Sequence, residues 1–504
     1  MPLFLFDLYY MEKMNYLRMF RWTLVASVIL VFFAVGCEKD DTVEPVNNKE
    51  EQKKPDKTVD SVALAEKALI KAKKYYLSNC YPYYYWIDEM DSTVKSLNMN
   101  DFKTMESYFD ATLYSKDHWS WMADGSYYAQ SETGEYEGTW GASLMQQIEY
   151  YDDYSIRVAY VYPGSPFARN GVKRGWTLTE IDGRAVRETI IDGSFYSEYT
   201  KSPQTFTFLD HDSAAHTFTT SLASIETSSS LMSKVFTSLD FPGLTEPVGY
   251  FLYMSFKADF LNDIHEAMAY FKSKDVHKLI LDLRYNGGGD SRASKLLVDY
   301  LAPKSANHLP FAHRCFNKQH SDEDVIDSIS RLPGSLDLDA LYVIGSDGTA
   351  SASELVINGL RPYMDLTLVG DTTYGKPNGM YVFLYPNNPK TNAKYSVGDY
   401  SDLEYVFLPI CFYNKNGVGD EIPEDGFIPD NYRPDDLTHD FGVEEDIVKA
   451  CLTKIVTGTF PDLPAPRHRY SISTRAGAAG QYRLPDNRSP FYGLTIEPFP
   501  GQVQ

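Results

Sequence analysis

Cysteine is scarce in this chain: only 5 of its 504 residues are cysteines, and their spacing matches no metal-binding pattern. Beyond Cys37, the four others are widely separated and leave three disulfide pairings open; they are Cys80, Cys315, Cys411 and Cys451. The 10 histidines are scattered along the chain. We therefore predict no metal site and no other cofactor.

Positively charged residues are too few to balance the negative ones: the chain has 47 lysines and arginines but 69 aspartates and glutamates, which gives a formal net charge of −22. Nucleic-acid binding needs a basic face for the phosphates, so this balance excludes a nucleic-acid partner. Hydrophobic residues make up 43% of the chain, which is ample for a core. The length predicts about two to four domains.

Long apolar runs are lacking as well, and the run from Trp22 to Val35 is shorter than a confident membrane span. Basic residues precede it, and it ends in Ala34-Val35-Gly36-Cys37, which resembles a lipobox. The resemblance implies a signal segment at residues 1–37 and a lipid anchor on Cys37. The alternative is an uncleaved amino-terminal anchor, and both place the chain outside the cytoplasm.

The residues after Cys37 are strongly polar. Glu38-Lys39-Asp40-Asp41 is similar to the export signal of surface lipoproteins in Bacteroidota-type bacteria, which implies an outer-membrane, surface-exposed location in the cell envelope. Residues 38–60 contain almost no apolar side chains. Such a composition cannot bury a core, so we predict a disordered tether.

The segment from Leu341 to Met380 predicts a strand, a glycine loop, a helix, a second strand and another glycine loop. Ser351 then stands at the head of the helix, where backbone N–H groups are unpaired. The plain interpretation is a capping box with Glu354, in which the serine hydroxyl only accepts a hydrogen bond. The functional interpretation is a nucleophile, which needs a base.

Lys376 could be that base, although a loop lysine is ordinarily solvated. Its ordinary pKa of about 10.4 means that deprotonation at pH 7 costs roughly 4–5 kcal/mol in water. Burial in an apolar pocket can remove most of that cost.

A run of glycines follows a predicted strand in the segment from His277 to Asp290, HKLILDLRYNGGGD. Consecutive glycines let backbone N–H groups approach a bound anion or oxyanion. A phosphate loop is not supported, because neither Gly-Lys-Ser/Thr nor G-x-G-x-x-G is present. A flexible strand-to-helix turn is the structural alternative.

The motifs LDLRYNGGG, TASASE and a Gly-Lys pair with its lysine 25 residues after the serine resemble the C-terminal processing peptidases, or tail-specific proteases. That family has a crotonase-like core and a Ser/Lys dyad. The resemblance implies that Ser351 is the nucleophile and Lys376 the general base. It also implies an oxyanion hole built from the backbone N–H of Ala352 and one from Gly287, Gly288 or Gly289.

The chain departs from the family at two positions. Met380 stands where many members have a glutamine that orients the lysine, and Pro362 where some have an aspartate. Three residues are candidates for the missing orienting role: Asn378, Glu354 and Tyr374.

The remaining pattern predicts a multidomain α/β protein. Residues 61–138 have helical periodicity, and residues 139–225 resemble a PDZ domain that precedes or interrupts the core. Its carboxylate-binding loop would be Gly141, Ala142, Ser143 and Leu144. Residues 226–460 form the predicted crotonase-like peptidase core, and residues 461–504 are expected to be irregular.

These features predict a serine endopeptidase that acts on peptide or protein substrates recognised near their C-termini. Two alternatives stay open. The first is a peptide- or lipid-binding lipoprotein of the same fold that has lost hydrolysis, and the second is a scaffold that recruits partners through the PDZ-like domain. The sequence leaves the oligomeric state open.

Overall fold

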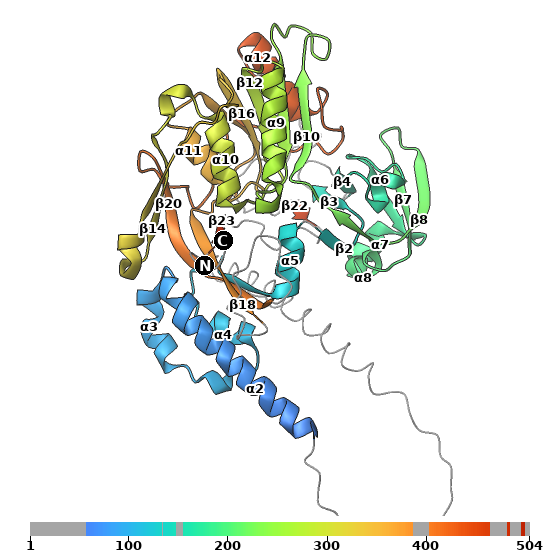
Figure 1. Ribbon diagram of the computed structural model, residues 1–504. Coiled ribbons are helices and arrows are strands. Elements are labelled where there is room, and N and C mark those ends of the chain that lie inside the picture. Colours follow the sequence, from blue (N-terminus) through green and yellow to red (C-terminus); the bar gives the residue numbers. More distant parts are fainter. Residues whose placement is uncertain are drawn as a thin grey trace, which may run out of the picture. The chain divides into compact units, whose positions relative to one another are not determined.

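The structure is a computed structural model that describes residues 57–133, 135–147, 155–386, 403–463, 481–483 and 495–498 (Figure 1). The predicted signal segment, Cys37 and the tether up to residue 56 lie outside the described residues. Within the described ranges, no helix combines the length and the apolar character needed to cross a membrane.

A six-stranded sheet forms the centre of the peptidase-like region. Its strand order is β10-β11-β12-β16-β17-β21, parallel throughout except for β10, which pairs antiparallel with β11. The bounds are β10 Ser230–Phe236, β11 Val248–Tyr253, β12 Lys278–Asp282, β16 Ala340–Gly345, β17 Leu366–Gly370 and β21 Asn431–Tyr432.

Both faces of this sheet are buried, as the continuous apolar runs predict. In β12, Leu279 and Leu281 face a core shared with α9, α10 and α11, whereas Ile280 between them faces a core shared with α12. The helices are α9 Leu261–Ser273, α10 Ser291–Leu301, α11 Ala352–Leu360 and α12 Asp446–Thr457 (Figure 1). The predicted mixed α/β architecture is confirmed.

A second sheet of eight strands includes β18, the strand that begins two residues after Lys376. Its main path is β1-β19-β18-β20-β14-β15, with β13 and β23 attached beside β18. The bounds are β1 Trp121–Asp124, β13 Gly289–Asp290, β14 Pro310–Phe316, β15 Val325–Ser328, β18 Asn378–Pro386, β19 Leu403–Leu408, β20 Ile410–Asn416 and β23 Thr495–Pro498.

An amino-terminal helical region packs its aromatic residues against β18, β19 and β20. Tyr76, for example, lies 5.2 Å from Phe407 between ring centroids. The helices are α2 Lys57–Tyr75, α3 Ile87–Ser96, α4 Met105–Ala111 and α5 Gly125–Thr133, with short turns η2 Tyr76–Cys80, η3 Tyr81–Tyr83 and η4 Met99–Asp101. Three further short turns lie in the core: η5 Ala258–Phe260, η6 Lys304–Ala306 and η7 Lys318–Glu323.

The region predicted to be PDZ-like contains its own sheet, of order β22-β3-β4-β5-β7-β8 with β6 beside β5. Its elements are β3 Ala142–Gln147, β4 Ile156–Val161, α6 Pro166–Arg169, β5 Thr177–Ile181, β6 Arg184–Ala185, α7 Val186–Ile191, α8 Phe195–Tyr199, β7 Gln204–Leu209 and β8 Ala215–Thr220. A separate two-stranded pair joins β2 Glu135–Thr139 and β9 Ala223–Glu226.

The segment after residue 460, expected to be irregular, contributes two short strands. β22 (Gln481–Arg483) pairs antiparallel with β3. β23 (Thr495–Pro498) pairs parallel with both β13 and β18. These strands form by pairing with strands that are already present, so no hydrophobic periodicity in their own sequence predicts them.

The four cysteines in the described part of the chain, Cys80, Cys315, Cys411 and Cys451, are all free thiols. None of the three open pairings is formed there.

A buried ionic network fixes the strand that leads into the glycine loop. Arg284 is 1% exposed and forms ion pairs with Asp282, Asp435 and Glu445. Arg174, from the PDZ-like region, donates 2.8 Å to the same Asp435. The guanidinium groups hold the pKa of Asp435 down at about 2 despite its burial. The network therefore ties three distant segments of the chain to the start of the glycine loop.

Replacing Arg284 with methionine should lower stability by about 3–5 kcal/mol, because the buried carboxylates lose their main cation. Urea unfolding of both proteins measures the loss. The control is Lys95→Met, which removes an exposed pair with Asp91 and should cost no more than about 1 kcal/mol. Equal losses in the two variants would contradict a structural role for the network.

Candidate functional site

Ser351 lies immediately before α11 in a backbone conformation that non-glycine residues rarely adopt. Its φ is 56° and its ψ is −109°, and its side chain is fully buried. Such conformations cost of order 1–3 kcal/mol and persist only where the surroundings enforce them. A capping box with Glu354 is present, as the plain interpretation predicts, but the strained backbone sets this serine apart from an ordinary helix cap.

Lys376 lies in the loop between β17 and β18 and has no exposed surface. Among the described residues, its Nζ has no hydrogen-bond partner. Burial lowers the pKa of Lys376 to about 7, and the negative charges of Asp117 and Glu354 oppose that shift. A large fraction of this amine is therefore neutral at neutral pH, as a general base requires.

Glu354 joins the serine turn to the lysine loop. Its Oε2 accepts hydrogen bonds from the backbone N–H of Ser351 at 2.8 Å and of Lys376 at 2.9 Å. Its Oε1 accepts from the N–H of Gly375 at 2.7 Å and from Thr373 Oγ1 at 2.6 Å. Burial raises the pKa of Glu354, and these four bonds partly offset the rise. One carboxylate thus fixes both reactive residues through their backbones.

Gly375 has to be glycine at this junction. Its φ is +87°, and a Cβ there would lie 2.2 Å from the carbonyl oxygen of Glu424. Any side chain would push the lysine loop away from the Glu424 segment. In the Gly-Lys pair, the glycine is therefore required for steric reasons, whereas the lysine supplies the amine.

The glycine loop is attached directly to the serine turn. The carbonyl oxygen of Asn286 accepts hydrogen bonds from the N–H of Ala350 at 3.2 Å and from Ser353 Oγ at 2.8 Å. The loop and the head of α11 therefore form one assembly, as an oxyanion hole built from Ala352 and a loop glycine requires.

The three glycines do not have equal opportunity to donate to a substrate. The N–H of Gly288 already donates to Asn286 Oδ1 at 2.9 Å. Gly289 has φ +135°, and a Cβ there would lie 1.9 Å from the carbonyl oxygen of Phe256. Gly287 therefore stays a candidate for the oxyanion donor, as does Gly289 once its pairing with Thr495 of β23 is released.

The candidate orienting residues occupy different environments. Glu354 and Asn378 are buried, and Asn378 opens β18 two residues after the lysine. Tyr374 is 45% exposed. Met380, at the glutamine position of the family pattern, is buried among apolar side chains of β18 and β19 and offers no hydrogen bond to the amine.

Asp117 contributes to the site although the sequence analysis does not select it. It lies about 260 residues before Lys376 in sequence, and its charge is the leading influence that raises the lysine pKa against burial. Tyr84 Oη donates to Asp117 Oδ2 at 2.8 Å, and the backbone N–H groups of Trp119 and Ser120 donate to its Oδ1. No local motif marks this residue, because only the packing of the helical region brings it near the lysine.

The predicted carboxylate-binding loop lies at the start of β3. Gly141 has φ +71°, and its N–H already donates to Thr139 Oγ1 at 2.9 Å. Ser143 and Leu144 are buried, and Ala142 is partly exposed. One edge of β3 pairs with β4, and the other pairs antiparallel with β22. This second edge is the kind that an extended peptide can join.

Taken together, these residues provide a buried hydroxyl, an amine with a pKa of about 7 and adjacent backbone donors. That combination can perform acyl transfer through a covalent serine intermediate.

Comparison with known proteins agrees with this chemistry. Residues 247–407 match the family model described as Peptidase family S41. The chain is 26% identical over 132 residues to the carboxy-terminal processing protease CtpB of Bacillus subtilis, covering 26% of this chain and 25% of that protein. It is 30% identical over 146 residues to the carboxyl-terminal-processing protease of Synechocystis, covering 29% and 32%. The matches therefore span at most about a third of these relatives.

A candidate S41 protease from Bacteroides fragilis shares the fold. Its crystal structure superimposes with a TM-score of 0.59 at 22% identity, covering 81% of this chain and 99% of that one. Ser351, Lys376 and the glycine loop all lie within the part that matches the family model.

The burial of Lys376 predicts a pH-dependent cost in stability. Below pH 7 the lysine is charged in both folded and unfolded chains, and the folded protein bears the full burial penalty. The penalty falls as the pH rises from about 7 toward the ordinary lysine pKa. Lys376→Met should therefore stabilise the protein by a few kcal/mol at pH 6 and by much less at pH 10, as measured by urea unfolding.

Lys95→Met, at an exposed lysine, provides the control and should show no such dependence. A stability difference between wild type and Lys376→Met that does not change with pH would show that the amine is solvated in the folded protein.

Proposed function

We propose that this chain, whose residues 247–407 match the model of peptidase family S41, is a serine endopeptidase with Ser351 as nucleophile and Lys376 as general base. The observation that carries the proposal is the lysine: it is buried, its pKa lies at about 7, and the carboxylate that holds its backbone also holds the backbone of Ser351.

In the first half of the reaction, neutral Lys376 Nζ takes the proton of Ser351 Oγ while the oxygen attacks a peptide carbonyl carbon. The carbonyl oxygen becomes an oxyanion that accepts hydrogen bonds from Ala352 and from Gly287 or Gly289. The C–N bond then breaks, the leaving amine takes the proton from the lysine ammonium, and an ester to Ser351 remains.

In the second half, Lys376 takes a proton from water, and the resulting hydroxide attacks the ester carbonyl. The ester bond breaks, Ser351 Oγ recovers its proton from the lysine, and the carboxylic acid product leaves. Because burial keeps the pKa of Lys376 near 7, the lysine can accept and return a proton in each cycle near neutral pH. None of the steps uses a metal ion.

Substrate recognition near a C-terminus is the finer part of the proposal. β3 presents an edge that accepts an antiparallel strand, and β22 approaches the Gly141 loop with its C-terminal end. A peptide added in this way would direct its terminal carboxylate toward that loop. The pairing supports a PDZ-like mode of recognition.

The cellular location also belongs to the proposal. The lipobox-like sequence ending at Cys37 and the acidic residues that follow it support a lipid-anchored protein of the cell envelope, which would act on extracytoplasmic peptide or protein substrates.

The experiment is cleavage of an unfolded protein and labelling by a fluorophosphonate probe, for wild type, Ser351→Ala and Lys376→Ala. Both variants should lose at least about 10³-fold in kcat/KM, because either loss removes the activated nucleophile. Wild-type kcat/KM should rise with pH through an inflection near 7, since the neutral amine is the active form.

Ser107→Ala is the control, because it removes an exposed hydroxyl that bonds to the carbonyl oxygen of Thr104 and should keep the pH inflection. Equal cleavage by wild type and both dyad variants would refute the dyad. Binding of peptides without any Ser351 acylation would favour the non-hydrolytic alternative, for which the apolar Met380 is the supporting observation.

A further inference from the structure

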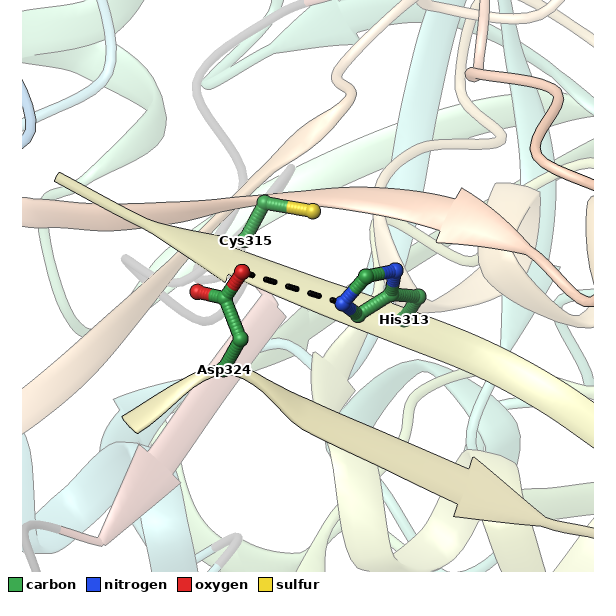
Figure 2. A group of neighbouring side chains, drawn as sticks. All are labelled: His313, Cys315 and Asp324. Atoms are coloured by element: carbon green, nitrogen blue, oxygen red, sulfur yellow. Dashed lines mark ion pairs between the residues drawn. The ribbon is translucent and has the colours of Figure 1, made fainter. Parts of the chain in front are cut away.

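Three side chains that can ligate a metal lie together on the β14–β15 hairpin, away from the Ser/Lys site in sequence. They are His313, Cys315 and Asp324, and one ligand atom from each lies within 4.8 Å of the others. Figure 2 shows the three groups facing one another, with His313 Nε2 at 3.8 Å from Asp324 Oδ2. The sequence predicts no metal, because no cysteine and histidine spacing matches a metal-binding pattern; here two of the side chains come from one strand and the third from the other end of a loop.

The hairpin register explains the cluster. His313 pairs with Ile326 and Arg314 with Val325, so continuing the register sets Cys315 opposite Asp324. His313 and Cys315 are two residues apart and therefore share one face of β14. Arg314, which lies between these two residues in sequence, points to the other face and forms an ion pair with Asp327 at 2.9 Å. The three ligand types thus meet on one face by strand geometry.

We propose that His313, Cys315 and Asp324 bind a divalent transition metal ion of the zinc class, with one position left for water. Imidazole nitrogen, thiolate sulfur and carboxylate oxygen are the three ligand types of zinc in proteins. With bonds of about 2.0–2.3 Å, tetrahedral ligands lie about 3.3–3.8 Å apart, so the side chains need to move by about 1 Å. Asp324 is already oriented, because its Oδ1 accepts the N–H of Phe316 at 2.8 Å.

The charged side chains that act on Cys315 are two acids, Asp324 and Glu421, and one lysine, Lys415. Lys415 is itself paired with Glu421 at 3.0 Å, which limits its repulsion of a metal ion. Metal binding displaces the thiol proton to solvent, so the affinity should fall as the pH falls.

A metal here would close a loop that contacts the amino-terminal helical region. Cys315 and Asp324 bracket residues 316–323, in which Asn317 Nδ2 donates to the carbonyl oxygens of Pro82 and Tyr84 at 2.9 and 3.0 Å. The ring of His320 stacks on Tyr83 at 4.0 Å between centroids. The site would therefore act as a structural clamp on this contact.

The test is titration of chelator-treated protein with Co²⁺ and Zn²⁺. Co²⁺ should produce a thiolate-to-cobalt absorption band that Zn²⁺ abolishes, and Zn²⁺ should raise the melting temperature. Cys315→Ser should remove the band, and His313→Ala and Asp324→Asn should weaken binding at least about tenfold. His216→Ala, in a His–Asp pair without a thiol, is the control and should leave binding intact.

A wild-type protein without the band, or a band that survives in Cys315→Ser, would overturn the proposal. A band that His216→Ala also removes would do the same, because the site would then lie elsewhere.

A second inference comes from β23 and rests on the proposed function. Thr495 and Ile496 pair in parallel with Gly289 and Asp290 of the glycine loop, and Ile496 also pairs with Met380 of β18. The strand therefore fills the gap between the glycine loop and the strand that begins two residues after Lys376. We infer that residues 495–498 occupy the substrate path as a ligand in cis.

The physical reason is that backbone pairing is exclusive. An extended substrate that reached the glycine loop between β13 and β18 would need the N–H and C=O groups that β23 uses. A tethered segment competes at high effective concentration, so it lowers the apparent affinity for free peptides.

The test compares the full chain with Ile496→Pro and with a chain ending at Leu463. Proline removes the N–H of the central paired residue, so both altered chains should show at least about fivefold faster fluorophosphonate labelling of Ser351 and faster cleavage of a short peptide. Gln502→Pro, placed after the strand, is the control and should behave like the full chain.

Equal rates in all four proteins would overturn the cis ligand and leave the peptidase proposal standing. A Ser351 that reacts in none of them would overturn both.

Discussion

The site depends on one buried carboxylate. Glu354 accepts hydrogen bonds from the backbone of the nucleophile turn and from the backbone of the lysine loop, which come from opposite ends of an α–β unit. Without that shared acceptor, no hydrogen bond to Glu354 would hold the turn at Ser351 and the turn at Gly375 in a fixed relative position. The carboxylate therefore provides a rigid frame for the dyad without having to contact Lys376 Nζ.

The same frame supports the proposed role of Lys376 in a chain that has Met380 where the family pattern has an orienting glutamine. Lys376 is fully buried. Desolvation lowers its pKa, and the charge of Asp117 limits how far the pKa falls. The position of Lys376 is then set by the backbone hydrogen bonds of its loop. Its proton affinity is set by burial and by the charge of Asp117. The two requirements for a lysine base are met by different parts of the molecule.

The structure also connects the peptide-binding surfaces. The β3 edge and the gap between β13 and β18 both receive strands from the last part of the chain. Arg174 joins the PDZ-like region to the network around Arg284, which immediately precedes the glycine loop. The buried ionic network therefore connects the region that contains β3 to the strand that leads into the glycine loop.

Much of the fold and the site could be predicted from local sequence. Apolar runs bounded by glycine marked strands of the central sheet, and helical spacing marked α11, because periodicity reports which faces are buried. Ser351, Lys376 and the three glycines stood out because turns and helix starts restrict residue type locally. Glu354 was visible as well, but only as a capping partner.

Tertiary structure decided what depends on distant neighbours. Sequence could not select Asp117, join His313 and Cys315 to Asp324, or predict that residues 495–498 add to a sheet edge, since these contacts are set by packing and strand register. The sequence by itself determined the reactive groups and the turns that present them. Only the folded chain determined their burial, and burial is what lowers the pKa of Lys376 to about 7.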